Sequence, residues 1–324
     1  MNIDDQLLYR VAEDYYVKNK IQREIAKELG VSRVQVSKYL KMAKERGLIR
    51  VEVIAPQLTE EQQAAYDAKF KDRFSIEKVL IAPGCGHEIA LRARLSALAE
   101  TYIFGNIEDP YTTVGLGWGH SVCDFTENIG RYKLTSWRIV PLAGGSTFAS
   151  SKYYNTNHIV HLLAEKLEAQ AVLLYLPFLM EPNKYRDSHS FTEEYDRVYS
   201  IWEQLDVVVC GVGNPRNLVR SPYFRSEVIK DYIDEMEKQA VVGDMLTHCF
   251  DVDGNYIRCA IEERMINVSF EQIRRAKRKV IITFGDDRVE ALIGAMNARL
   301  IDVLVTDQDT ADGILARLSK PQQE

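Results

Sequence analysis

Four glycine-rich segments of the sequence have the composition of ligand-binding turns. Each follows a run of apolar residues, and they cover residues 114–121, 142–147, 209–214 and 282–288. If the apolar runs are parallel strands, backbone N–H groups and helix starts at their carboxyl ends can hold an anion. A single glycine turn would be weak evidence, because any tight turn favours glycine. Four such turns predict a pocket for a phosphate or a polyol.

Basic side chains are concentrated near the amino terminus. Residues 18–50 hold ten Lys or Arg side chains and three Glu, a local charge of +7, whereas the whole chain has a net charge of −6. Neutralising DNA phosphates requires positive charge that is local rather than global. The pattern predicts a small basic module that binds double-stranded DNA, joined to a large acidic body that repels it.

The spacing of apolar residues in this basic module indicates three helices. Apolar residues recur at intervals of three and four along residues 7–16, as a first amphipathic helix requires. A second helix over residues 22–29 ends at Gly30, which suits the left-handed backbone of a helix end. Ser32 is a suitable N-cap for a third helix, whose buried side would carry Val36, Leu40 and Ala43. Two helices joined by a tight glycine turn are the helix-turn-helix arrangement of DNA-binding proteins.

The other face of the third helix carries charged and amide side chains. Arg33 and Gln35 near its start can bond base edges in the major groove, and Lys38 and Lys41 are better placed to neutralise phosphates. A merely solvated surface is the alternative for any run of charge, but the glycine turn and the local charge of +7 favour DNA. We predict DNA contacts from Gln22, Ser32, Arg33, Gln35, Ser37, Lys38 and Lys41.

The predicted elements divide the chain into three parts. Residues 1–55 form the helical head, whose alternating stretch at 47–54 fits a wing strand or simply the return to the next part. A polar linker helix is predicted within residues 56–75. Residues 76–324 alternate β-branched apolar runs with amphipathic segments, the pattern of a doubly wound, mainly parallel α/β sheet.

Cofactor and metal sites are disfavoured. Glycines within residues 115–119 lack the GxGxxG spacing of a dinucleotide-binding turn. His158 and His161 lie one helical turn apart without a third ligand at metal spacing, so an exposed helix face is favoured over a metal site. The acidic segment 251–254 could open a calcium loop, but the remaining ligand spacing is absent and a hairpin turn is favoured. We predict no cofactor and no metal.

The sequence has the features of a soluble cytoplasmic protein. No stretch approaches the ~18 consecutive apolar residues of a membrane span, and the start carries Asp4 and Asp5 rather than a basic targeting region. The five cysteines are odd in number and never spaced as CxxC, so neither disulfides nor zinc are indicated. We expect no membrane partner.

Several motifs together resemble the SorC family of sugar-responsive bacterial transcriptional regulators. The resemblance covers nearly the whole chain and rests on residues 22–33, 114–119, 211–213, 242–254 and 304–307. It implies a sequence-specific DNA-binding regulator, not an enzyme, with a winged helix-turn-helix head and a Rossmann-like domain related to sugar-phosphate isomerases. It also implies a homo-oligomer, dimer or tetramer, controlled by a small phosphorylated sugar or a related anionic metabolite.

The same resemblance implies which residues bind the effector. They are Gly119, His120, Ser121, Gly144, Gly145, Ser146, Asn155, Arg220, Asp244 and Arg288. Asp244 is expected to accept sugar hydroxyls and Arg288 to meet the anionic end, although a turn-capping acid and a surface arginine are the alternatives. The family usually has threonine at the place of His120 and lysine at that of Arg288. Because arginine favours bidentate contacts, the effector could differ from common sugar phosphates and include a carboxylate.

Two functions from other classes are the rivals. A sugar-phosphate isomerase with an added DNA-binding head would need a paired acid and base, and no motif assigns one. A nonspecific DNA-coating protein would leave the large acidic part without a role.

Overall fold

The computed structural model describes residues 4–46, 48–49, 57–84, 87–145, 152–180, 189–214 and 227–319. The chain divides into two compact units, Met1–Ala55 and Pro56–Glu324. We call them the smaller and the larger unit.

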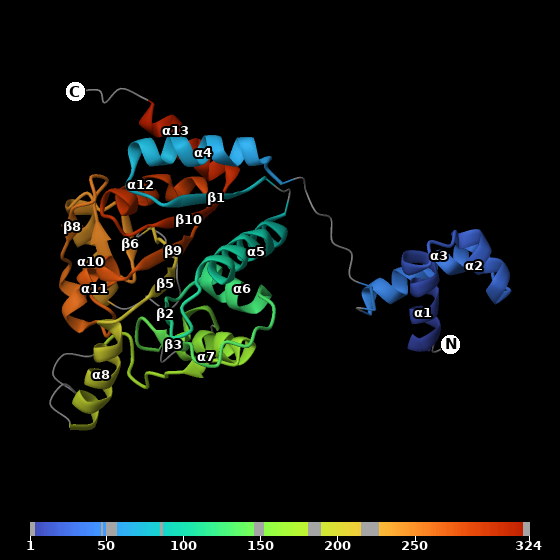
Figure 1. Cartoon of the computed structure of the whole chain (residues 1–324), viewed down its shortest axis with the longest axis horizontal. Helices are drawn as coiled ribbons and strands as arrows, with labels where there is room; N and C mark the ends of the chain where they lie inside the picture. The colour runs from blue at the N-terminus through green and yellow to red at the C-terminus, as the bar shows by residue number, and fades with distance from the viewer. Residues whose placement is uncertain are drawn as a thin grey trace. The chain divides into compact units, whose positions relative to one another are not determined.

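Short helices make up the described part of the smaller unit (Figure 1). They are α1 (Asp5–Ala12), the π-helix η1 (Glu13–Val17), α2 (Gln22–Leu29) and α3 (Arg33–Glu45). Ser32 caps α3, because its side chain accepts a hydrogen bond from the Gln35 N–H. Gly30 ends α2 with a φ of 65°, the left-handed conformation expected at that position.

The apolar faces of these helices form the core of the smaller unit. Val11, Ile25 and Val36 are fully buried and pack in one cluster. The predicted buried side of the third helix is confirmed, since Val36, Leu40 and Ala43 are its buried residues. The predicted wing strand at 47–54 lies almost entirely outside the described residues.

A parallel sheet forms the centre of the larger unit, with seven strands among the described residues. Their order is β1-β10-β9-β5-β2-β3-β4. The bounds are β1 (Lys78–Ala82), β2 (Thr113–Leu116), β3 (Arg138–Pro141), β4 (Gln170–Ala171), β5 (Val207–Cys210), β9 (Arg278–Ile282) and β10 (Val303–Asp307). The chain returns from β4 at one edge to β5 beside β2, so β9, β5 and β2 are central neighbours. This confirms the mainly parallel α/β sheet predicted from the sequence.

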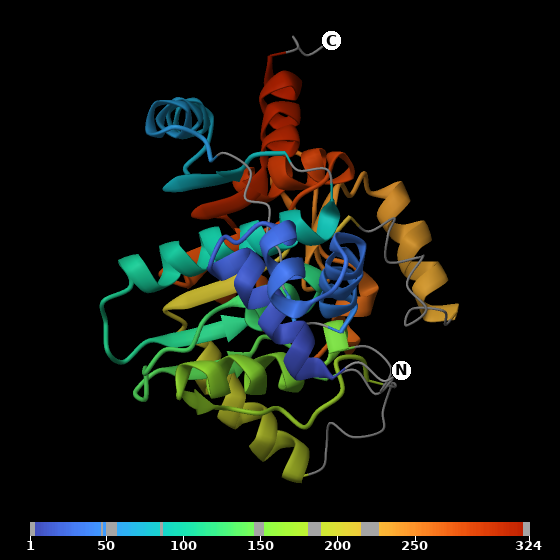
Figure 2. The same ribbon diagram turned by 90° about the vertical axis from the view of Figure 1, so that its right-hand side faces the viewer.

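Helices cover both faces of this sheet (Figure 1 and Figure 2). One face carries α5 (Glu88–Asn106), α6 (His120–Asn128) and α7 (Thr156–Leu167), and the other α4 (Glu60–Arg73), α12 (Val289–Asn297) and α13 (Gln308–Leu318). Alternate residues of β5 enter two separate cores: Val207 and Val209 face α5–α7, whereas Val208 and Cys210 belong to the opposite core. Burial on both faces explains why this strand is uniformly apolar.

The remaining helical segments among the described residues surround these layers. They are α8 (His189–Trp202), α10 (Glu227–Lys238), α11 (Phe270–Arg275) and the short turns η2 (Lys152–Tyr154), η4 (Ala260–Arg264) and η5 (Asp286–Arg288). No described helix of the chain combines the length and apolar character needed to cross a bilayer.

A small antiparallel sheet was not predicted from the sequence. It consists of β6 (Gly243–Met245), β7 (His248–Phe250) and β8 (Tyr256–Ile257), in that order. The predicted hairpin turn at 251–254 is confirmed, because it joins the antiparallel pair β7 and β8 and contains Gly254 with a φ of 85°.

The helix expected as a linker packs into the larger unit. Phe70 of α4 is fully buried in the core. The side chains of Asp67 and Gln63 bond the backbone of Val79 on the edge strand β1; Asp67 accepts from the Val79 N–H at 2.9 Å. These side chains satisfy backbone groups that an edge strand otherwise exposes, so α4 covers the sheet edge.

Candidate functional site

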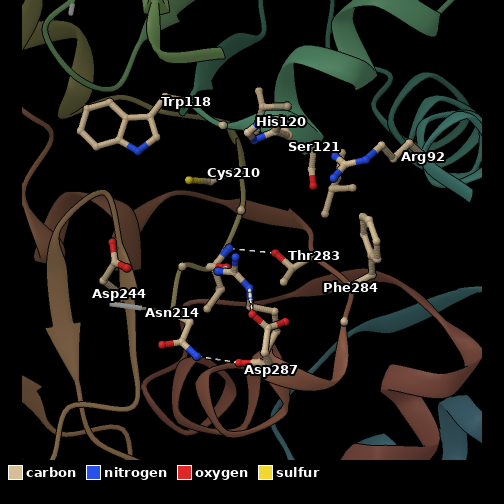
Figure 3. Close-up of a pocket in the computed structure, with 18 of the residues that line it drawn as sticks. Arg92, Trp118, His120, Ser121, Cys210, Asn214, Asp244, Thr283, Phe284 and Asp287 are labelled. Atoms are coloured by element: carbon tan, nitrogen blue, oxygen red, sulfur yellow. Dashed lines mark hydrogen bonds and ion pairs between the residues drawn. The ribbon is translucent and has the colours of Figure 1, made fainter. Parts of the chain in front are cut away.

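A cavity of about 410 Å³ lies beyond the carboxyl ends of β2, β5 and β9. Three of the four predicted glycine segments contribute to its lining, together with β6 and the start of α5. In Figure 3, Trp118 and Asp244 lie on one side of the cavity, and Arg92 and Phe284 lie on the other. Five of the predicted effector residues line it: Gly119, His120, Ser121, Asp244 and Arg288.

Asp244 on β6 presents a carboxylate with one free oxygen. Its Oδ2 accepts a hydrogen bond of 3.1 Å from the Thr247 N–H, whereas Oδ1 is buried without a hydrogen-bond partner among the described residues. Burial raises the pKa of Asp244, and the Thr247 bond and the charge of Arg288 oppose that shift. A buried acceptor is costly unless a bound molecule supplies a donor. Oδ1 of Asp244 is therefore suited to accept a hydrogen bond from a ligand hydroxyl group.

Arg288 is fixed in the wall formed by the loops after β5 and β9. Its Nη1 donates to the Val212 carbonyl at 3.2 Å, and its Nε lies 3.4 Å from the Asp287 carboxylate. Thr283 Oγ1 accepts from the Val212 N–H at 2.8 Å, and the Asn214 amide donates to the Asp287 carbonyl at 2.9 Å (Figure 3). These bonds join the two loops and place a cation beside the cavity.

His120 begins α6 at the rim of the cavity. Its ring stacks on Tyr153 with centroids 3.9 Å apart. Partial burial lowers the pKa of His120, and the nearby positive charge of Arg92 acts in the same direction. The imidazole is therefore neutral at pH 7 and adds a polar group rather than a charge to the site.

Arg92 on α5 supplies a second cation to the lining. It donates to Glu88 at 2.6 and 3.0 Å and to Asp124 at 3.0 Å, and its guanidinium lies 5.1 Å from the centre of the Phe284 ring. These contacts hold the guanidinium in one orientation. Among the described residues, these partners use three of its five N–H groups, which leaves two for another acceptor.

Several residues assigned by the family resemblance lie elsewhere. The N–H groups of Gly144 and Gly145 donate to backbone carbonyls of neighbouring segments at 2.8 Å, and neither residue lines the cavity. Asn155 caps α7 with its side chain and also lies outside the lining. Ser146 and Arg220 lie outside the described residues, so their contribution stays a prediction.

Sequence reasoning missed several lining residues, among them Glu88, Arg92, Trp118, Thr283 and Phe284. Glu88 and Arg92 are spaced as an i, i+4 ion pair, the pattern of an ordinary solvated helix surface. Trp118, Thr283 and Phe284 lie within predicted glycine segments, and that position was the available signal.

Among the described residues, no group of three His, Cys, Asp or Glu side chains is placed to hold a metal ion. His158 and His161 are both exposed on α7. Asp251 instead accepts a hydrogen bond from the Asn255 N–H at 2.9 Å, which stabilises the hairpin turn.

In the smaller unit, the predicted DNA-contacting residues are on the surface. Ser32, Arg33, Ser37, Lys38 and Lys41 are exposed, and Gln22 and Gln35 are half-buried. Lys18, Lys20, Lys41 and Arg46 form ion pairs with acidic side chains. Within the described residues Arg23, Lys27, Arg33, Lys38 and Lys44 form none, so their charges are available to an external anion.

A surface hollow of the smaller unit brings the starts of α2 and α3 together. It is lined by Tyr15, Tyr16, Asn19, Lys20, Ile21, Gln22, Arg23 and Arg33. Gln22 and Arg33, eleven positions apart in the sequence, therefore share one surface.

Comparison with known proteins decides the family. The family model "Putative sugar-binding domain" matches residues 59–316. The chain belongs to this family. The matched region begins next to the first residue of α4, which agrees with the packing of that helix into the larger unit.

Relatives match the chain over nearly its full length, and two of them illustrate the similarity. The sorbitol operon regulator of Klebsiella pneumoniae is 24% identical over 318 residues, covering 97% of this chain and 99% of the relative. The deoxyribonucleoside regulator of Bacillus subtilis is 26% identical over 320 residues, covering 96% and 97%. The crystal structure of the full-length sorbitol operon regulator SorC from Klebsiella pneumoniae superposes with a TM-score of 0.72 at 24% identity, covering 97% of this chain and all of that one.

These matches confirm the SorC-family resemblance noted in the sequence. The chain is a SorC-family transcriptional regulator with a sugar-binding domain, and its relatives bear the names of regulators rather than enzymes. The superposition supports the Rossmann-like, mainly parallel fold of the larger unit.

Proposed function

We propose that this SorC-family regulator binds specific double-stranded DNA through a helix-turn-helix in its smaller unit. We further propose that a small polyhydroxylated ligand with an anionic group, such as a sugar phosphate, binds in the cavity of the larger unit and controls that DNA binding. Under this proposal α3 is the recognition helix.

The DNA-binding half rests on how α3 divides its side chains. Val36 is fully buried, whereas Arg33 and Lys38 are exposed without an ion-pair partner among the described residues. Free guanidinium and ammonium groups on a helix of this kind can contact base edges and phosphates and release the counterions of DNA. Arg33 at the helix start is our candidate for base contacts, and Lys38 for phosphate contacts.

One observation carries the ligand-binding half: Oδ1 of Asp244 is buried beside the cavity and lacks a hydrogen-bond donor among the described residues. A ligand hydroxyl would supply that donor. Arg92 and Arg288 provide positive charge for an anionic group, and the first turn of α6, which includes His120 and Ser121, can present backbone N–H groups to it. The Gly119 N–H itself donates to the Tyr153 carbonyl at 2.8 Å. The names of the two relatives, a sorbitol operon regulator and a deoxyribonucleoside regulator, support a carbohydrate-like ligand.

The family resemblance supports two further parts of the proposal. The larger unit is related in fold to sugar-phosphate isomerases, and the chain acts as a homo-oligomer, dimer or tetramer. A symmetric oligomer would place two helix-turn-helix units on a palindromic site. Sedimentation of the full chain as a monomer at micromolar concentration, with and without DNA, would contradict the oligomer.

Footprinting and a thermal-shift screen test the function together. The full chain is expected to protect a short symmetric DNA segment. Polyols, sugar phosphates and sugar acids are screened for a rise in melting temperature, which any ligand of the folded state produces by mass action. Uniform protection of all DNA, or chemical turnover of a sugar phosphate at enzyme-like rates, would contradict the proposal.

A further inference from the structure

The turn that joins β6 and β7 has an unusual backbone for its sequence. Only Leu246 and Thr247 separate the paired residues Met245 and His248, and their φ angles are 53° and 73°. Two-residue hairpins with positive φ at both central positions favour Asn and Gly. A β-branched residue with positive φ is rare, because its side chain crowds the backbone. The surroundings must therefore hold this turn in place.

The side chains of the turn explain why glycine is absent. Leu246 is only 2% exposed, belongs to the core of the larger unit and lines the cavity. Thr247 is fully buried. Glycine at position 246 would relieve the strained backbone but would remove part of the cavity wall. A large residue at this position therefore serves the cavity at the expense of backbone strain.

Asn267 bonds both residues of the turn, whose Thr247 carbonyl also accepts a hydrogen bond of 3.5 Å from the Tyr232 hydroxyl. Its Nδ2 donates to the Leu246 carbonyl at 2.6 Å and to Thr247 Oγ1 at 3.3 Å. The backbone of Asn267 forms an isolated antiparallel bridge with Ala143, which lies two residues after the end of β3. This bridge anchors Asn267 to the main sheet. Asn267 thereby connects the strained turn to a rigid element.

The same turn fixes the carboxylate of Asp244. The Thr247 N–H donates to Oδ2, and this bond leaves Oδ1 buried beside the cavity without a partner among the described residues. If the turn relaxed to ordinary φ values, the N–H would leave Oδ2, and the carboxylate would be free to rotate. The orientation of Oδ1 thus depends on the left-handed turn.

We infer that Asn267 is a positioning residue of the effector pocket: it holds the Leu246–Thr247 turn in its left-handed form and so keeps Asp244 Oδ1 ready to accept a ligand hydroxyl. This inference rests on the proposed function for the ligand, and it identifies a hydroxyl-bearing carbohydrate as the ligand class. Asn267 itself does not contact the ligand.

Two substitutions separate positioning from general stability. Asn267→Ala removes the restraint, and Thr247→Gly removes most of the cost of the left-handed backbone. The full chain is titrated calorimetrically with sorbitol 6-phosphate and with glucose 6-phosphate. Asn267→Ala is expected to weaken binding about tenfold, and Thr247→Gly added to it is expected to restore most of the affinity. Asn297→Ala is the matched control, because the Asn297 amide holds the Val252 carbonyl in the next hairpin at 2.8 Å.

Hydrogen exchange of the segment 242–250 provides a readout that needs no ligand. Asn267→Ala should accelerate exchange there, and the added Thr247→Gly should reverse the change. An affinity loss no larger than that of Asn297→Ala, or a loss that Thr247→Gly does not restore, would overturn the inference. If the wild-type chain binds neither sugar phosphate, the proposed ligand class is wrong. The positioning role of Asn267 is then judged by hydrogen exchange alone, and an unchanged exchange rate in Asn267→Ala would overturn it.

Discussion

Gly213 and Asp244 exchange two backbone hydrogen bonds, from the Gly213 N–H to the Asp244 carbonyl at 2.7 Å and in the reverse direction at 3.2 Å. This pairing connects the loop after β5 to β6. A side chain on residue 213 would collide with Oδ1 of Asp244. The absence of a side chain at 213 therefore makes room for the oxygen that we expect to bind the ligand.

Gly213→Ala is expected to weaken ligand binding by tenfold or more, because the new methyl group displaces the Asp244 carboxylate. Calorimetry with sorbitol 6-phosphate measures the effect. Gly145→Ala is the control, since a methyl group there meets nothing within 4 Å. If both variants bind the ligand with the affinity of wild type, Oδ1 of Asp244 does not contact the ligand. A loss in Gly145→Ala would instead support the contact that the family resemblance assigns to Gly145.

Asp244→Asn is expected to stabilise the ligand-free protein at pH 7 while removing its response to ligand. Burial raises the pKa of Asp244, so the folded state holds the proton more tightly than the unfolded state. Stability therefore falls as the pH rises from about 4, the ordinary value, through the raised pKa. Asparagine removes this cost. A gain of about 1 kcal/mol corresponds to roughly 2–4 °C in melting temperature.

Melting curves at pH 7 and near pH 4 check this prediction. The advantage of Asp244→Asn should be present at pH 7 and shrink at the lower pH. A variant that melts below wild type at pH 7 would show that the carboxylate is satisfied in the ligand-free protein.

The sequence predicted the main sheet and the place of the pocket because both depend on local patterns. β5 is uniformly apolar, β9 ends in the apolar run 280–282, and both are followed by glycine turns, which marks them as buried parallel strands with open carboxyl ends. Asp244 and Arg288 could be assigned only through the family resemblance. Their surroundings, such as the unpaired Oδ1, depend on contacts between distant segments.

Other parts of the site carry no local signal. The turn at Leu246 and Thr247 lacks the Asn or Gly that marks a two-residue hairpin, so the small sheet was missed. Arg92 is spaced like a surface ion pair, and only the packing of α5 beside β9 brings it to the cavity. The helix α4 lies within the predicted segment 56–75, but its packing onto β1 had no local signal, because the bond between Asp67 and Val79 joins the helix to a separate strand.

His120 is expected to influence ligand binding only at low pH. Its pKa is lowered, so the ring gains a proton only below about 6.5, the ordinary value. The affinity ratio of wild type to His120→Gln for sorbitol 6-phosphate should be flat from pH 7 to 8 and rise as the pH falls below 6. Titration of the ligand phosphate affects both proteins alike and cancels in the ratio. A ratio that changes near pH 7.5 would contradict the neutral state of His120.

Arg33→Ala and Lys38→Ala are expected to weaken DNA binding in different ways. Arg33→Ala should cost about 1–3 kcal/mol on the specific site and relax base preference, whereas Lys38→Ala should weaken all DNA and lower the salt slope by about 1. Lys238→Ala removes an exposed lysine of α10 in the larger unit and serves as the control. Equal losses on specific and random DNA for both variants would contradict the assigned roles.

Ligand control of DNA binding is tested most directly by fluorescence anisotropy of a labelled DNA segment carrying the footprinted site. The full-length wild type and Asp244→Asn are each titrated with and without a saturating sugar phosphate from the screen. We predict that the ligand shifts the DNA midpoint of wild type at least fivefold and leaves that of Asp244→Asn unchanged, with equal DNA affinity for the two proteins without ligand. An equal ligand shift in both proteins, or DNA binding that no ligand changes, would contradict control through this cavity.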